Sequence, residues 1–196
     1  MKTFLAEVKT SVLLTLGFAV LLCGAYPLVV WAGAQALFPA KANGSLVTDA
    51  AGTVRGSALL AQSFTSDQYF QPRPSAAGTG YDATGSSGTN LGPTSQKLAD
   101  SIKAAVAAYR TTNGLAAVRP VPADAVTSSG SGLDPHISLA NATLQAGRVA
   151  KARGLPLEKV TGLVAAHTAG RDLGVLGEPG VNVLTLNLAL DQLAAQ

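Results

Sequence analysis

Hydrophobic residues dominate one continuous stretch near the start of the chain. Residues 11–40 contain no charged side chain, although charged residues lie on both sides of the run. A helix rises about 1.5 Å per residue, so about 20 apolar residues cross a hydrocarbon core of roughly 30 Å. Neither face of the run is polar, which is atypical of a helix in a soluble domain. The pattern predicts a transmembrane helix over residues 11–38, preceded by a short N-terminal segment over residues 1–10.

Two other interpretations of this run compete with a permanent anchor. A secretory signal would use Lys2 and Lys9 as its basic start and the small residues at 32–36 as its cleavage site. The apolar core of such a signal spans only about 7–15 residues, however, and this run is longer. A lipoprotein signal at Cys23 is disfavoured because Leu22 stands where a small residue is expected. We therefore expect the anchor to be retained.

Three residues inside the run bear on how the helix packs and what it can transport. Pro27 lacks a backbone donor and is expected to kink the helix. Gly17 and Gly24 are seven residues apart, so they share a helix face that either accepts a second helix or simply reflects the frequency of glycine in membranes. The run carries no titratable carboxylate, histidine or lysine, and one helix encloses no pore. A partner protein would have to supply any ion pathway.

The basic residues that flank the run indicate its orientation. Lys2 and Lys9 precede it, and only Lys41 follows closely. Because basic residues favour the cytoplasmic side, we expect the N-terminus in the cytoplasm and residues 39–196 outside it.

Beyond the run, the hydrophobic spacing changes to that of a soluble domain. The clearest helix, residues 93–110, has apolar positions at helical spacing and is followed by Asn113 and Gly114, which typically end a helix. Strands and helices follow one another without regular alternation, which predicts one α+β domain. The expected elements are strands over 54–64, 118–126 and 181–188, helices over 93–110, 138–153, from about 156 and over 191–196, and a long loop over 71–93.

Charge and cysteine content exclude several classes of function and of site. Residues 41–196 hold twelve basic and ten acidic side chains, which is too balanced for a nucleic-acid-binding surface. The only cysteine, Cys23, lies in the apolar run. The domain after the run therefore has no disulfide and no cysteine-based metal site or thiol chemistry.

The familiar catalytic motifs are missing from the chain. No phosphate-binding G-x-x-x-x-G-K-[ST] loop, no G-x-S-x-G nucleophile elbow and no H-E-x-x-H zinc pair occurs. With only His136 and His167 available, we expect neither a metal site nor a bound cofactor. Asp134 and His136 next to Ser131 or Ser138 would suit an exported, membrane-tethered hydrolase. The sequence favours a plainer interpretation, because Asp-Pro opens turns and a histidine at the start of a helix is usually a hydrogen-bonding residue.

Two further polar features suit a functional role and a purely structural role equally well. Gln145 and Arg148 are three residues apart and so neighbours on one helix face, as an exposed polar pair would also be. Arg73 lies between Pro72 and Pro74 and is therefore held on a stiff segment, which suits either a contact residue or a rigid surface loop.

Longer strings of residues make the chain recognisable. It reads YFQPRPSA at 69–76, SGTNLGP at 87–93, VPADAVTSSGSGLDPHIS at 121–138, QAGRVA at 145–150 and GEPGVNVL at 177–184. Together with the single N-terminal span, these strings closely resemble the C subunit of the Kdp-type potassium-transporting P-type ATPase over essentially the whole chain. Small departures are Thr89 for an expected serine and Leu139 for an expected proline.

This resemblance implies a subunit of a bacterial inner-membrane complex that imports K⁺ at the expense of ATP. In that family a channel-like A subunit carries the ion, a P-type ATPase B subunit is phosphorylated, and a small F subunit stabilises the assembly. The C subunit is required but is not the enzyme, and the complex handles ATP and K⁺. The C subunit of that family has been described as a catalytic chaperone that raises the ATP affinity of the B subunit.

The resemblance also points to particular residues. Gln145, with Arg148, matches the segment whose glutamine has been linked to nucleotide. The candidates for contact with partner subunits are Arg73, Ser75, Asn90, Asp134 and His136.

The predicted orientation conflicts with a nucleotide role for Gln145, because it puts this residue on the far side of the membrane from ATP. Three explanations would resolve this conflict. Either the chain has the opposite orientation, or its effect on nucleotide is indirect, or its chief role lies outside the cytoplasm. We favour a domain over the mouth of the A subunit that stabilises the complex or controls K⁺ access. The alternatives are the tethered hydrolase and a single-span sensor, whose cytoplasmic end of about ten residues is too short for a signalling domain.

Overall fold

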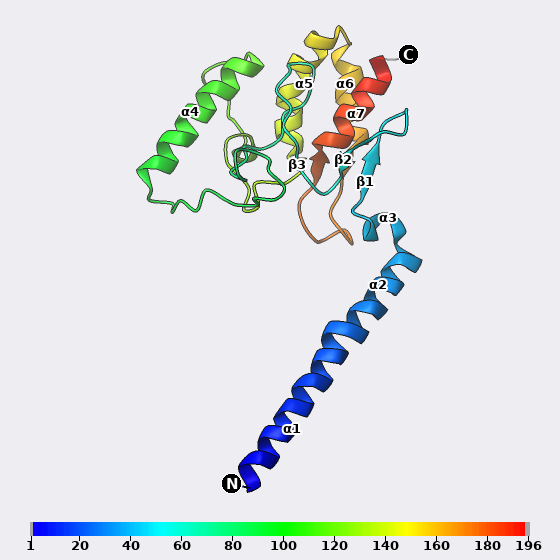
Figure 1. Ribbon diagram of the computed structural model, residues 1–196. Coiled ribbons are helices and arrows are strands. Elements are labelled where there is room, and N and C mark those ends of the chain that lie inside the picture. The colour runs from blue at the N-terminus through cyan, green and yellow to red at the C-terminus, as the bar shows by residue number, and fades with distance from the viewer. Residues whose placement is uncertain (1, 195–196) are drawn as a thin grey trace. The chain divides into compact units, whose positions relative to one another are not determined.

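The chain divides into two structural units. The computed structural model describes residues 2–194, and its units comprise residues 1–46 and 47–196. The first is helical, and the second mixes helices with two small sheets (Figure 1). The predicted α+β class with one N-terminal apolar helix is thereby confirmed.

The first unit is built around one long apolar helix. Within the described part of the chain, Thr3–Leu37 is the one helix long and apolar enough to cross a membrane, with a mean hydropathy of 2.2 in its most apolar window, none of which is buried. Its successive parts are α1 (Lys2–Ala19), the π-helical η1 (Val20–Ala25) and α2 (Tyr26–Leu37), and the short α3 (Pro39–Ala42) follows.

Pro27 explains the π-helical turn in the middle of this helix. Its nitrogen carries no hydrogen, and its ring would collide with the carbonyl of Cys23 in a regular α-helix. In η1 the turn is wider, and Tyr26 N–H donates to Leu21 O five residues earlier. A π turn inside an α-helix commonly marks such a local conflict. The helix thus accommodates Pro27, the residue expected to kink it, through a wider turn.

The second unit contains a two-stranded and a three-stranded sheet. β1 (Leu46–Thr48) pairs with β2 (Val54–Ser57). In the other sheet the order is β3-β5-β4, and β5 (Gly180–Asn182) is antiparallel to both β3 (His136–Ile137) and β4 (Thr168–Ala169). Val181 therefore lies opposite Ile137 on one side and Thr168 on the other.

α5 (Leu139–Arg153) and α7 (Val183–Ala194) contact β5 of this small sheet, and α6 (Leu157–Ala166) packs against both helices. The other helical segments of this unit are α4 (Gln96–Asn113), which contacts α5 and lies to one side in Figure 1, and η2 (Ala123–Ala125, a 3₁₀ turn). The predicted helices at 93–110, 138–153 and from about 156 correspond to α4, α5 and α6. Glycines in the left-handed conformation end two of them as expected, Gly114 after α4 with a φ of 61° and Gly154 after α5 with a φ of 65°. The core consists of Phe70, Ile137, Ala142, Ala146, Val149, Ala150, Val160, Val164, Val181, Val183, Leu186 and Leu190.

Two of the predicted strands are wrong in extent or in kind. Only Val54–Ser57 of the expected strand 54–64 is a strand, because a turn begins at Ser57, whose carbonyl accepts a hydrogen bond from Leu60 N. Gln62 Nε2 also donates to the carbonyl of Arg55. Residues 118–126 form turns and η2 instead of a strand. Pro120 and Pro122 remove the backbone donors that a strand there would need.

The predicted strand 181–188 is also wrong beyond its first residues. The chain leaves β5 at Asn182 and enters α7, which absorbs most of the short terminal helix expected at 191–196; residues 195 and 196 lie outside the described part. Asn182 Oδ1 accepts from Thr185 N at 3.1 Å and caps the helix. Val183, Leu186 and Leu190 are buried at helical spacing, so a few alternating positions had suggested the wrong period.

Candidate functional site

Residues 69–76, here the clamped segment, have no regular secondary structure, and side chains of two helices in the second unit bind the backbone of Phe70 and Gln71. Asn187 of α7 accepts from Phe70 N at 2.8 Å and donates to Phe70 O at 2.9 Å. Gln145 of α5 binds Gln71 in the same way, at 2.8 and 3.0 Å. Neighbouring strands exchange N–H···O bonds in this pairwise manner, and adjacent residues of an extended chain turn their backbone groups to opposite edges. Two side-chain amides thus replace the neighbouring strands.

Gln145 uses its whole hydrogen-bonding capacity inside the protein. Its Oε1 also accepts from Arg148 Nη2 at 2.8 Å, and its Nε2 also donates to Asn141 Oδ1 at 2.9 Å. A primary amide offers two donors and two acceptor lone pairs, and all four are occupied. The residue is only 1% exposed. A ligand could therefore bind Gln145 only by displacing one of these partners.

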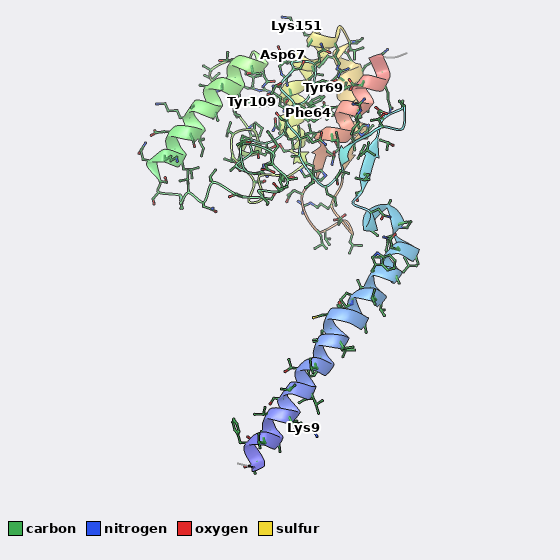
Figure 2. The ribbon with its side chains drawn as sticks, viewed as in Figure 1. Lys9, Phe64, Asp67, Tyr69, Tyr109 and Lys151 are labelled. Carbon is green, nitrogen blue, oxygen red and sulfur yellow. The ribbon has the colours of Figure 1, made fainter. Side chains whose placement is uncertain are left out.

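Arg148 fastens the start of the clamped segment. Its Nη1 donates to Asp67 O at 2.7 Å and Tyr69 O at 3.0 Å, and its Nε donates to Asn113 Oδ1 at 3.0 Å. Burial lowers the pKa of Arg148, while the Asp67 carboxylate, 3.9 Å from Nη1, opposes that change. Figure 2 labels Asp67 and Tyr69 on this stretch. Instead of an exposed pair, Gln145 and Arg148 form a buried joint.

The same network reaches α4 and η2 through Asn141. Asn141 Oδ1 accepts from the hydroxyl of Tyr109, which lies between α4 and α5 in Figure 2, at 2.8 Å. Asn141 Nδ2 donates to Asp124 Oδ2 at 2.9 Å, and Asp124 also accepts from the backbone and hydroxyl of Ser138. Burial, together with the charge of Asp124, raises the pKa of Tyr109 well above its usual range. The network links three elements to the clamped segment.

A second cluster gathers around the far end of the clamped segment. Arg73 Nη1 contacts Asp134 Oδ2 at 2.9 Å, and His136 N donates to Asp134 Oδ1 at 3.0 Å. Hydrogen bonds from His136 and Arg73 lower the pKa of Asp134 to about 2. Ser75 Oγ donates to Gly132 O at 2.6 Å. Four of the predicted contact residues are thus brought together from two distant strings of the sequence.

An open depression of about 770 Å³ adjoins this second cluster. Its lining includes Arg73, Asp134 and four serines, Ser86, Ser128, Ser129 and Ser131. Among the described residues, Arg73 Nε is the buried side-chain nitrogen or oxygen that lacks a hydrogen-bond partner. The surface therefore offers hydroxyl groups and a cation beside a carboxylate, a mixture suited to polar contacts.

The remaining predicted site residues lie apart from these clusters. Asn90 is exposed with a φ of 52°, and no hydrogen bond among the described residues joins it to Arg73 or Asp134. Gly17 and Gly24 have open space where a side chain would project, within the described residues of their own chain. Gly24 lies within the π turn, so the two glycines do not have the spacing of a regular α-helix face. Their role in helix packing stays a prediction.

The geometry does not assemble the hydrolase considered from the sequence. Ser138 Oγ donates to Asp124 and caps α5 by accepting from Asn141 N. Ser131 Oγ accepts from Leu133 N. Within the described residues neither serine is hydrogen-bonded to His136, so the nucleophile–base contact of such an enzyme is missing.

Sequence reasoning missed several members of the buried network, namely Asp124, Asn141 and Asn187. A usable signal existed for Asn141, because residues 141, 145 and 148 fall at the i, i+4 and i+7 positions of one helix face. Polar residues at the spacing of a buried stripe indicate an internal network. Asn187 gave no such signal, because its helix was expected to be a strand.

Comparison with known proteins places the chain in a family. The family model described as "KdpC: K+-transporting ATPase, c chain" matches residues 8–192. A protein of Rhodospirillum rubrum named potassium-transporting ATPase KdpC subunit is 58% identical over 168 residues, 86% of each chain. Proteins with the same name from Nitratidesulfovibrio vulgaris and Mycobacterium bovis are 54% and 52% identical, over 97% and 95% of this chain and 96% and 98% of theirs. The chain therefore belongs to the KdpC family of K⁺-transporting ATPase subunits.

Proposed function

We propose that this chain stabilises a potassium-importing ATPase from outside the cytoplasm, by docking its second unit over the mouth of the ion-conducting A subunit and controlling K⁺ access there. The apolar helix would anchor the chain in the bacterial inner membrane beside the A, B and F subunits. As a KdpC chain, the protein is a subunit of the potassium transport complex and not its catalytic chain.

The clamped segment is the observation that carries this proposal. Two buried amides and a buried guanidinium hold its backbone from three positions, and the segment ends in Arg73 and Ser75 beside Asp134. A buried polar network with all its bonds made is rigid. Rigid presentation of polar side chains lowers the entropy that docking costs. The network therefore suits a surface that another subunit recognises.

The composition of the apolar helix supports a role beside the ion pathway. Residues 11–40 carry no charged group that could bind an ion in lipid, and a single helix cannot enclose a pore. K⁺ would therefore cross the membrane through another subunit, with this chain acting on access from outside.

The role of Gln145 in nucleotide affinity, implied by the resemblance, would be indirect. Because all four hydrogen-bonding positions of Gln145 are occupied by protein groups, an effect on ATP would pass through the clamped segment and the partner subunits. Labelling the purified chain with azido-ATP tests this directly. We expect no labelling, and labelling that Gln145→Ala abolishes would instead support a nucleotide site.

Protease accessibility tests the orientation. In sealed spheroplasts, external trypsin should cut within residues 41–196, where twelve lysines and arginines occur. Intact residues 41–196, with outside control proteins cut, would place the domain in the cytoplasm.

Retention of partner subunits tests the docking role. A C-terminal tag on the wild-type chain should co-purify the large P-type ATPase subunit and the ion-conducting subunit in detergent. Arg73→Ala should reduce that retention because it removes the cation from the presented surface. Arg119→Ala, an exposed arginine on a different loop, is the matched control for charge. Equal retention by both variants would argue against docking through this surface.

A further inference from the structure

The connection between β4 and β5 ends in an apolar tip. Leu173 is 90% exposed, Val175 is 71% exposed and Leu176 is 58% exposed. Three aliphatic side chains so close together would ordinarily be buried. We call residues 170–179 the apolar loop, which lies below β3, in brown and orange, in Figure 1. No other described part of the chain covers this tip.

The apolar loop is held in one shape by its own bonds. Arg171 Nη2 contacts both carboxylate oxygens of Glu178 at 2.8 Å and joins the two sides of the loop. Asp172 and Leu176 exchange backbone hydrogen bonds of 2.8 and 2.9 Å. A preorganised loop loses little conformational freedom when it binds. The backbone that carries its exposed side chains is therefore preorganised.

The tight turn at the tip holds a leucine in an unfavourable backbone conformation. Leu173 has a φ of 53°, and Gly174 follows with a φ of 77°. Two successive positive φ angles are typical of tight hairpin turns, whose first position usually holds Asn, Asp or Gly. A leucine there is unfavourable, and its side chain gains almost no packing within the chain. Such an outlier points to a contact that the side chain makes elsewhere.

Charge and composition distinguish between lipid and protein as the covering surface. Arg171 contributes +1, and Asp172 and Glu178 contribute −1 each, so the apolar loop carries a net charge of −1. Segments that bind anionic lipid surfaces carry basic residues, and interfacial anchors favour Trp and Tyr. The apolar loop has no aromatic residue, and its one basic side chain is already paired. A protein pocket fits these features better than a lipid surface.

We propose that Leu173, Val175 and Leu176 insert into an apolar pocket on another subunit of the same potassium-transporting ATPase. This inference rests on the proposed function and names a second contact, separate from the Arg73 surface. The occupant follows from membership of a multi-subunit transport complex together with the loop's negative charge and lack of aromatic residues.

Substitution at Leu173 separates docking from folding. Leu173→Gly relieves the positive φ, so the thermal midpoint of the purified full-length chain should stay level or rise. The same variant should retain at least about tenfold less of the ATPase subunits in detergent, as removal of a central contact side chain typically does. Val175→Ser together with Leu176→Ser should reduce retention similarly. Val118→Ser is the matched control, because Val118 is also 90% exposed and lies in another loop.

Each other outcome of this experiment has a definite meaning. Wild-type retention by the apolar-loop variants in detergent would overturn the inference, including the case in which they lose binding only to lipid nanodiscs. Loss of association between tagged and untagged copies of this chain, with ATPase subunits retained, would also overturn it. Failure of the wild-type chain to retain any ATPase subunit would sink the proposed function itself, and the inference with it.

Discussion

Gln145 shows how one buried side chain can connect distant parts of the fold. It lies on α5, but its amide satisfies the backbone of Gln71, 74 residues earlier in the chain. Asn187 does the same for Phe70 across 117 residues. A buried backbone group without a partner costs about 1–3 kcal/mol, so these two amides make the path of residues 69–76 possible.

Loss of either amide should destabilise the clamped segment, and loss of Gln145 should cost more because Gln145 also binds Arg148 and Asn141. Gln145→Ala and Asn187→Ala each leave a backbone N–H and C=O of the clamped segment without partners, so each should lower the free energy of unfolding by at least about 1–3 kcal/mol. For a domain of this size that lowers the thermal midpoint by about 2–4 °C per kcal/mol. Differential scanning calorimetry of the two variants measures this.

The comparison also separates direct from indirect effects on nucleotide. The half-saturating ATP concentration of the complex should shift in both variants if the clamped segment transmits the effect. A shift in Gln145→Ala alone would indicate a role that Asn187 does not share. Val160→Ala, which loses packing in the same core but removes none of the amide hydrogen bonds to the clamped segment, controls for lowered stability.

Asp134 should make stability depend on acid pH. Its pKa falls from the ordinary 3.8 to about 2 in the folded chain, so the folded state binds this proton less readily than the unfolded state. The resulting stabilisation is fully present above about pH 4 and is lost as the pH falls toward 2. Asp134→Asn should therefore lower the thermal midpoint at pH 6 and have little effect near pH 2. An equal loss at both pH values would contradict this assignment.

At the scale of elements, the buried network depends on the start of α5. Ser138 caps this helix and also donates to Asp124, which in turn holds Asn141. Ser138→Ala should cost about 1–2 kcal/mol, as loss of a helix cap does. Chemical denaturation followed by circular dichroism measures the change. Ser101→Ala on the exposed side of α4 should change stability by less than about 0.5 kcal/mol, and a comparable loss there would remove the special role of the cap.

Helices were more predictable than strands for a physical reason. The ends of α5 could be read from Ser138 and Gly154, because caps and periodicity act over a few neighbouring residues. The strands β3, β4 and β5 contain only two or three residues each, too few to show alternation. Their existence depends on pairing between segments far apart in the chain. Because β5 ends after three residues and α7 follows at once, a few alternating positions across the two elements resembled one longer strand.

For the whole molecule, the two units should be separable. Among the described residues, every buried apolar residue of the core lies at position 61 or later, so removal of residues 1–46 takes nothing from that core. We expect residues 47–196 to be soluble and to unfold within about 2 °C of the full-length chain, since changes outside a packed core usually have small effects. Calorimetry of both chains tests this. Aggregation of the shorter chain, or a much lower midpoint, would show that the first unit supports the fold of the second.

The sequence by itself determined the apolar anchor, the absence of disulfides from the domain and the positions of α4, α5 and α6. Each of these depends on composition or on contacts between residues close in the chain. Only the tertiary structure decided that Gln145 and Asn187 clamp one segment and that Arg73 meets Asp134, 61 residues away. Only it showed that the tip of the apolar loop is exposed. Burial and hydrogen-bond partners depend on where distant segments meet, and that is a property of the folded chain.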